Sequence, residues 1–110
     1  MTALTLDWID IGALTDIPLR GARVVKTPRG CIAVFRPFDD SIFALDDRCP
    51  HKGGPLSDGI VHGHNVTCPL HSLVISLETG TSPADGSHVR THGVRVEAGR
   101  ILLDPAALRP

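Results

Sequence analysis

The chain has few aromatic residues and almost no net charge. Its 110 residues include three Phe, one Trp and no Tyr, and 11 Lys and Arg stand against 12 Asp and Glu, for a formal charge of −1. Domains that bind nucleic acids usually carry a clustered basic surface, often with aromatic side chains that stack on bases. The composition therefore argues against a nucleic-acid partner.

Long apolar runs are also missing. No stretch reaches the roughly 20 continuous apolar residues of a membrane helix, and residues 1–7 lack the basic start and apolar run of a signal peptide. We therefore expect a cytoplasmic protein with no membrane span. Its length predicts a single domain over residues 1–110, large enough to bury a core without disulfides.

Helical periodicity does not extend beyond about two turns anywhere in the chain. Short β-branched or apolar segments recur instead, separated by Gly, Pro and Asp turns, as at 21–26 and 31–36 and again at 94–97 and 100–103. Roughly nine such strands can be counted, the others including 41–45, 65–67 and 73–77 and a strand around Trp8. The pattern predicts an all-β fold of small antiparallel sheets.

Cysteine is scarce and odd in number, and two of the three cysteines stand beside histidines. The pairs are Cys49-x-His51 and Cys68-x-x-His71, with 16 residues between His51 and Cys68. In a reducing compartment, such pairs indicate a metal site ahead of a disulfide.

Both pairs follow predicted strands, so we expect two loops at strand ends to form a metal-binding part over roughly residues 46–80. A Cys₂His₂ set could hold a single zinc ion, and a zinc-stabilised binding module is one alternative. Zinc fingers usually group cysteine with cysteine and histidine with histidine, with at least two residues inside the first pair. The tight Cys-x-His spacing is unusual for that class.

The order and spacing of these four residues resemble the Rieske motif, in which two thiolates hold one iron of a [2Fe–2S] cluster and two imidazoles hold the other. The resemblance implies that Cys49 and Cys68 bind one iron, and that His51 and His71 bind the other. It also implies one-electron transfer as the function.

The same resemblance places the reduction potential within about −150 to +300 mV, because imidazoles in place of thiolates leave the cluster less negative. High-potential Rieske proteins carry hydroxyl donors where this chain has Leu73 and Ile75. Fewer hydrogen bonds to the sulfurs disfavour the added electron, so we expect the lower half of the range.

The wider segment from Cys49 to Gly80 closely resembles the Rieske-type small subunit of bacterial assimilatory NAD(P)H nitrite reductases, and the match spans most of residues 5–103. That resemblance implies a large-subunit partner carrying FAD, another iron–sulfur cluster and sirohaem, where nitrite is reduced to ammonia. It further implies an apolar rim of Pro50, Leu70 and the histidine edges for a redox partner. This chain shows no substrate-converting site of its own.

A Rieske ferredoxin that serves a ring-hydroxylating oxygenase is the alternative within the same superfamily. Most of those ferredoxins have glycine after the second histidine, followed by an aromatic residue and an aspartate. Ser72, Leu73 and Ser76 depart from that pattern.

The remaining reactive side chains are expected to be structural. Cys31 lies among apolar residues of a predicted strand, which is typical of a small buried hydrophobe. The other histidines and the aspartate pairs are expected to be surface or turn residues: His62, His64, His88, His92, Asp39-Asp40 and Asp46-Asp47.

Overall fold

The computed structural model describes residues 8–28, 30–39, 41–49, 54–68, 73–84 and 86–104. These ranges contain two 3₁₀ turns, η1 (Leu14–Asp16) and η2 (Leu56–Asp58), and no helix with the length and hydropathy of a membrane span. They also contain ten strands: β1 (Ile9–Ala13), β2 (Gly21–Thr27), β3 (Gly30–Arg36), β4 (Phe43–Asp46), β5 (Ile60–His62), β6 (Asn65–Thr67), β7 (Val74–Ser76), β8 (Thr91–His92), β9 (Val94–Glu97) and β10 (Arg100–Leu103).

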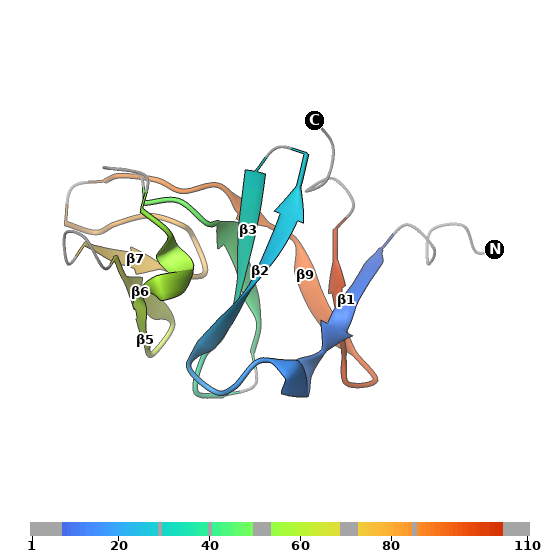
Figure 1. Cartoon of the computed structure of the whole chain (residues 1–110). Coiled ribbons are helices and arrows are strands. Elements are labelled where there is room, and N and C mark those ends of the chain that lie inside the picture. The colour runs from blue at the N-terminus through green and yellow to red at the C-terminus, as the bar shows by residue number, and fades with distance from the viewer. Residues whose placement is uncertain are drawn as a thin grey trace.

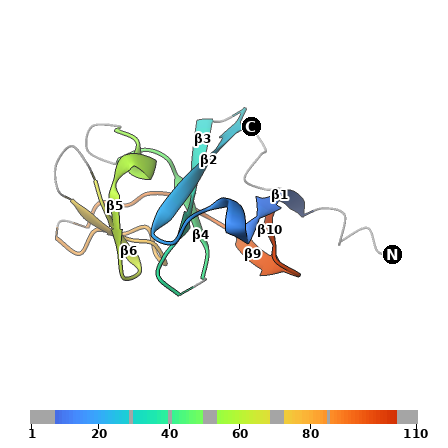
Figure 2. The same cartoon turned by 60° about the horizontal axis from the view of Figure 1, so that its bottom comes forward.

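The strands form three small antiparallel sheets, as the sequence predicts. Their orders are β1-β10-β9, β2-β3-β4-β8 and β5-β6-β7. Figures 1 and 2 show the sheet of β2 and β3 in the middle, with β5–β7 on one side and β1, β9 and β10 on the other. The middle sheet is therefore the one that both outer sheets can cover.

Strand β3 is buried on both of its faces. Successive side chains of a strand point to opposite faces. Ile32 and Val34 belong to the core on the side of β10, whereas Ala33 and Phe35 belong to the core on the side of β6 and β7. The continuous apolar run in this segment is explained by that double burial, as is typical of a covered strand.

Two separate cores result from this arrangement. The one between the middle sheet and β5–β7 contains two of the three cysteines, together with large apolar side chains. Its buried members are Ala33, Phe35, Leu45, Cys49, Leu56, Val61, Val66, Cys68, Leu73, Ile75, Leu77 and Val89. Cys49 and Cys68 are thus part of a packed core, away from the β1-β10-β9 sheet.

The predicted hairpins are confirmed. β2 pairs with β3, β3 with β4, and β9 with β10 in antiparallel register. The last hairpin turns at Ala98 and Gly99, where both residues have positive φ, 50° and 77°. Two central residues with positive φ are the mark of the type I′ turn that matches strand twist.

The prediction for Cys31 is wrong, because its side chain is exposed. Cys31 stands opposite Lys26 near the start of β3, and the buried stretch of the strand begins one residue later, at Ile32. The sequence also gives no strand at 60–62 or 91–92, where β5 and β8 form. These strands are too short to show a clear alternation.

Candidate metal centre

Two chain segments of equal length begin at the two motif cysteines. The Cys49 amide donates to the Gly54 carbonyl at 2.7 Å, and the Cys68 amide donates to the Leu73 carbonyl at 2.8 Å. Each closed segment, 49–54 or 68–73, includes one of the predicted histidine ligands. In both halves of the motif, the cysteine amide therefore donates to the carbonyl five residues later.

The two cysteines lie in one buried cluster, and neither is part of a disulfide. Each is 1% exposed. Cys68 directly follows β6 and Cys49 follows β4 after two residues, so both thiols are carried at strand ends as the sequence predicts. A pair of buried thiols on two matched segments fits a cofactor held by one thiolate from each side.

The other two predicted ligands, His51 and His71, lie outside the described residues. The structure therefore brings together only the two cysteines of the predicted set, among the residues that it describes. The assignment of all four residues as ligands stays a prediction that rests on the motif.

Asp47 ties the first motif segment to the 3₁₀ turn that follows it. Its Oδ1 accepts the Ser57 amide at 2.7 Å, and its Oδ2 accepts the Ser57 hydroxyl at 2.8 Å. Asp47 thus has a specific role beyond the turn chemistry expected of it. Because the partner is ten residues away, no local sequence pattern reveals this contact.

The expectation that His92 is a surface residue is also wrong. Its side chain is only 5% exposed, and its Nε2 lies 2.6 Å from Asp46 Oδ1. β8 pairs with β4 at this point, with His92 opposite Ala44, which brings the ring alongside the end of β4. Asp46 and Asp47 are adjacent at the end of β4 but contact different partners, His92 and Ser57 respectively.

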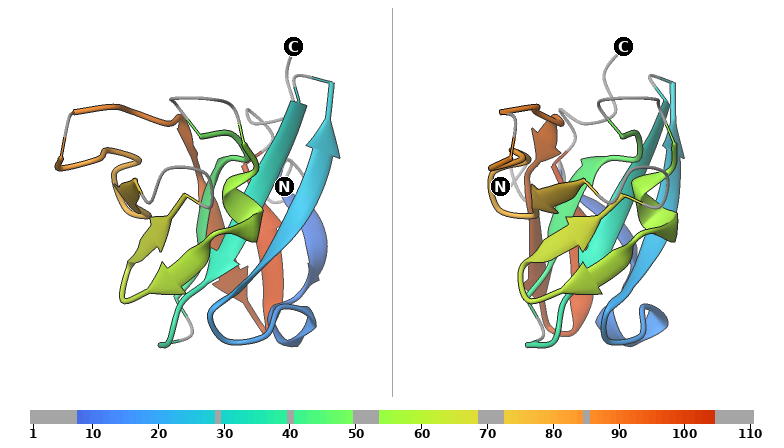
Figure 3. Two further views of the ribbon diagram at one scale, coloured as in Figure 1. Left: turned by 60° about the vertical axis from the view of Figure 1, so that its left-hand side comes forward. Right: turned by 90° about the vertical axis from the view of Figure 1, so that its left-hand side faces the viewer.

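A hollow of about 280 Å³ reaches the edge of Cys49. It lies where the chain leaving β4 meets the segment that leads into β8, and Figure 3 shows these two segments, green and orange, at the same end of the molecule. The residues lining it are Asp46, Arg48, Cys49, His88, Val89 and Arg90. Its accessible side chains are mostly basic, since Arg48, His88 and Arg90 are exposed.

His64 joins the β5–β7 sheet to the middle sheet. Its Nε2 lies 2.9 Å from Asp39 Oδ2 and its Nδ1 lies 3.1 Å from Glu78 Oε1. Its ring stacks on Phe38 and contacts Phe43 at a tilt. The expectation of a solvated loop histidine therefore fails for His64.

Both ring nitrogens of His64 face carboxylates, and only the protonated imidazole can donate to two acceptors at once. Hydrogen bonds with Asp39 and then Glu78 accordingly raise the pKa of His64. Hydrogen bonds from Ser41 and then from His64 lower the pKa of Asp39 to about 2. His62, two residues earlier, is exposed as expected and contacts Thr67.

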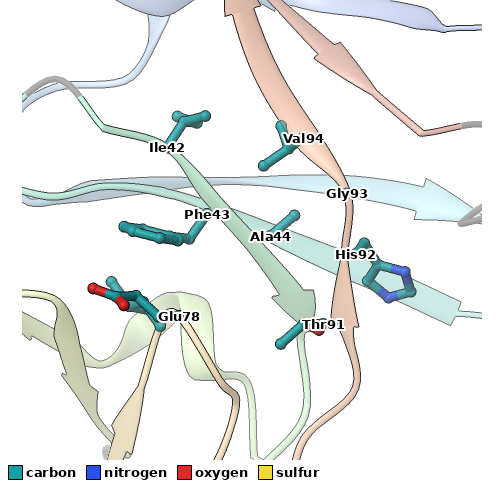
Figure 4. A pocket seen from close by; sticks show the side chains of 9 residues that line it. Ile42, Phe43, Ala44, Glu78, Thr91, His92, Gly93 and Val94 are labelled. Carbon is teal, nitrogen blue, oxygen red and sulfur yellow. The ribbon is translucent and has the colours of Figure 1, made fainter.

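A second hollow, of about 330 Å³, opens where β4 and β8 separate. The two strands pair only at Ala44 and Leu45, and the chain then turns away at Gly93 into β9 (Figure 4). Its two ionisable wall residues already have partners, Glu78 in His64 and His92 in Asp46. We therefore regard this hollow as a consequence of the strand divergence.

Comparison with known proteins indicates the same kind of cofactor as the buried cysteine pair, an iron–sulfur cluster. Residues 7–104 match the family of the Rieske-like [2Fe-2S] domain. The chain is 31% identical to the ferredoxin component of the naphthalene 1,2-dioxygenase/salicylate 5-hydroxylase systems of Ralstonia sp, over 91% of this chain and 97% of that protein. It is 38% identical to the 3-phenylpropionate/cinnamic acid dioxygenase ferredoxin subunit of Photorhabdus laumondii, over 80% of this chain and 85% of that protein.

A solved structure from Mycobacterium tuberculosis, described as an NADH-dependent nitrite reductase small subunit, has a similar fold. It superposes with a TM-score of 0.80 at 26% identity, covering 87% of this chain and 92% of that one. The predicted fold and cofactor are thus confirmed, and the predicted function is confirmed at the level of electron transfer. This chain belongs to the Rieske-like [2Fe-2S] domain family and is an electron-transfer ferredoxin with a Rieske-type [2Fe–2S] cluster.

Proposed function

We propose that this chain is a separate ferredoxin that delivers single electrons to a ring-hydroxylating oxygenase. The observation that carries the proposal is the match to named dioxygenase ferredoxins along nearly their whole length, 97% for the Ralstonia protein.

The four motif residues are the ligands in this proposal, with Cys49 and Cys68 on one iron and His51 and His71 on the other. The bound cluster would supply a centre that accepts and releases one electron. The equal segments 49–54 and 68–73 support the assignment, because each begins at one of the motif cysteines and contains one of the motif histidines in its sequence. We further propose that residues 46–80 are the cluster-binding part of one domain.

The chain's own contribution is to hold the two thiols in a dry, rigid setting. Leu56 and Ile75 are fully buried in the same cluster as both cysteines, and Leu73 is 9% exposed. Burial keeps water from the thiolates, and one backbone hydrogen bond in each segment holds the two ends of that segment together.

A role as the small subunit of an NAD(P)H nitrite reductase is the second candidate. The departures at Ser72 and Ser76 from the usual ferredoxin pattern favour it, and the fold similarity at a TM-score of 0.80 is compatible with it. The partner would then be a large subunit with FAD, sirohaem and an iron–sulfur cluster.

Affinity purification from the native host distinguishes the two roles. A separate ferredoxin elutes without a stoichiometric partner, and its reduced form is reoxidised when an oxygenase component, its aromatic substrate and O₂ are added. A nitrite reductase subunit instead elutes with a large chain that has sirohaem absorption. Stoichiometric co-elution of that chain would overturn the oxygenase proposal.

A further inference from the structure

Three basic side chains surround the hollow beside Cys49. Arg48 directly precedes the cysteine, whereas His88 and Arg90 come from the segment that leads into β8. All three are exposed, while Val89 between the last two is 5% exposed and anchors its segment in the core. We call Arg48, His88 and Arg90 the basic rim.

Backbone hydrogen bonds hold the two halves of the basic rim together. The Asp46 amide donates to the Arg90 carbonyl at 2.9 Å, and the Val89 amide donates to the Gly80 carbonyl at 2.7 Å. His88 also pairs with Thr81 in an isolated bridge. The positions from which these side chains extend are therefore set by the fold rather than by a loose loop.

The positive charge of the rim is not offset by ion pairs within the described part of the chain. The salt bridges found there join other residues, and Asp46, the carboxylate on the wall of the hollow, pairs with His92. A formal charge of −1 for the whole chain thus conceals a local excess of positive charge beside one motif cysteine.

Exposed charge beside a redox centre acts on the encounter with a partner. Complementary charges speed association and orient the two proteins, and like charges slow it. The effect falls as ionic strength rises because salt screens exposed charges.

We propose that the basic rim is a docking surface for a redox protein whose own docking face is rich in carboxylates. This proposal rests on the electron-transfer function and adds the sign of charge that the partner carries. The proposal is independent of the predicted apolar rim, whose members lie outside the described residues. In each encounter one electron passes between the two centres, and no bond is formed or broken.

A binding experiment tests the rim without relying on electron transfer. Fluorescent polyglutamate is titrated with the iron–sulfur-loaded protein at low ionic strength, and its anisotropy is recorded. We expect the double variant Arg48→Glu/Arg90→Glu to bind at least about tenfold more weakly. The control with the same change in net charge is Arg20→Glu/Arg23→Glu, which alters two exposed cations, and the amide of Arg20 donates to the Arg36 carbonyl at the far end of the β2–β3 hairpin.

When the titration is repeated at about 0.1 M salt, where exposed charges are screened beyond about 10 Å, the control should bind within about twofold of the unaltered protein, and the double variant should still bind more weakly. Equal weakening by the control and by the double variant would reduce the effect to net charge and overturn the proposal. Unchanged binding by the double variant would overturn it as well.

Electron transfer to two carrier proteins of opposite charge gives a second readout. Stopped-flow mixing of the reduced protein with acidic plastocyanin should be fast and slow down with salt, whereas mixing with basic cytochrome c should show the reverse salt dependence. The double variant should exchange the two behaviours. If that variant keeps the original salt dependences, the proposed docking role of the basic rim is contradicted.

The outcomes separate this proposal from the proposed function. A loaded protein that is not reoxidised by an oxygenase component with its substrate and O₂ would refute the proposed function, while the polyglutamate titration would still report on the rim. A protein with a normal visible spectrum and no preference for acidic partners would refute the rim alone.

Discussion

Asp47 is the residue through which the structure most directly supports the first motif segment. Its two hydrogen bonds with Ser57 connect the chain before Cys49 to η2 after Gly54. We expect Asp47→Ala to lower the free energy of unfolding by about 1–3 kcal/mol, because two donors lose a partly buried acceptor. The cluster should also be lost sooner to an iron chelator.

The rate of absorbance loss under chelator measures that effect. Asp47→Asn keeps one carbonyl acceptor and serves as the control, with an intermediate rate. An Asp47→Ala protein that loses its colour no faster than the unaltered protein would contradict a supporting role for this carboxylate.

The apolar residues after the second cysteine are expected to lower the reduction potential of the cluster. Leu73 and Ile75 are buried with the cysteines, and the chain contains no tyrosine to donate to the cluster sulfurs. We expect a potential in the lower half of about −150 to +300 mV. Protein-film voltammetry measures it, and a value near the upper limit would show that donors to the sulfurs have been overlooked.

At the scale of single residues, the sequence singles out the two motif cysteines more readily than the contacts that support their segments. Cys49 and Cys68 stand out because type and spacing are local properties. The partners of Asp47 and His64 do not, since they lie from 10 to 25 residues away in the chain. Cys31 was misassigned because an apolar neighbourhood in sequence does not reveal where a strand emerges from its core.

Among the elements, the segment that leads into β8 positions His88 and Arg90, two of the three residues of the basic rim, and depends on Gly80. Gly80 has φ 75°, and a Cβ there would lie 2.2 Å from the Val89 carbonyl oxygen. Gly86 has a nearly equal φ of 76° and no heavy atom within 4 Å of the same position. The two glycines thus differ in steric room and share their backbone conformation.

Substitution by alanine separates the cost of positive φ from the cost of the steric overlap with the Val89 carbonyl. Gly86→Ala should cost about 1–2 kcal/mol for positive φ alone, and Gly80→Ala should cost a further ~2 kcal/mol because backbone must move. Thermal unfolding followed by circular dichroism compares the two variants. Equal losses of stability would mean that the Val89 carbonyl is not held against Gly80.

The elements were predicted from sequence where their patterns are long enough. The β2–β3 and β9–β10 hairpins have turn residues and strands of four to seven residues, which show clear alternation or burial. β5 and β8 have three and two residues, and tertiary pairing with longer neighbours is what makes them strands.

For the molecule as a whole, the contact of His64 with two carboxylates links the β5–β7 sheet to the middle sheet. The raised pKa of His64 gives stability that is fully present below its ordinary value of 6.5 and is lost as pH rises through the folded-state value. The lowered pKa of Asp39 gives stability that is present above 3.8 and is lost as pH falls to about 2. The contact between His64 and Asp39 is therefore most stabilising between pH 3.8 and pH 6.5.

We expect the unfolding temperature of the unaltered protein to fall more than that of His64→Gln as pH rises above 6.5. His62→Gln is the control, because His62 is exposed and is the last residue of β5, just before the turn that contains His64. Parallel pH profiles for the unaltered protein and His64→Gln would contradict the link.

Pulsed EPR of the dithionite-reduced protein tests the central claim most directly, because it reports which atoms bind the cluster. A Rieske cluster held by Cys49, Cys68, His51 and His71 predicts a reduced [2Fe–2S] signal with coupling to two histidine nitrogens. Loss of one of those couplings in His51→Cys, with a reduced cluster still present, would agree with the assignment. A reduced cluster with no histidine nitrogen coupling in the unaltered protein would contradict it.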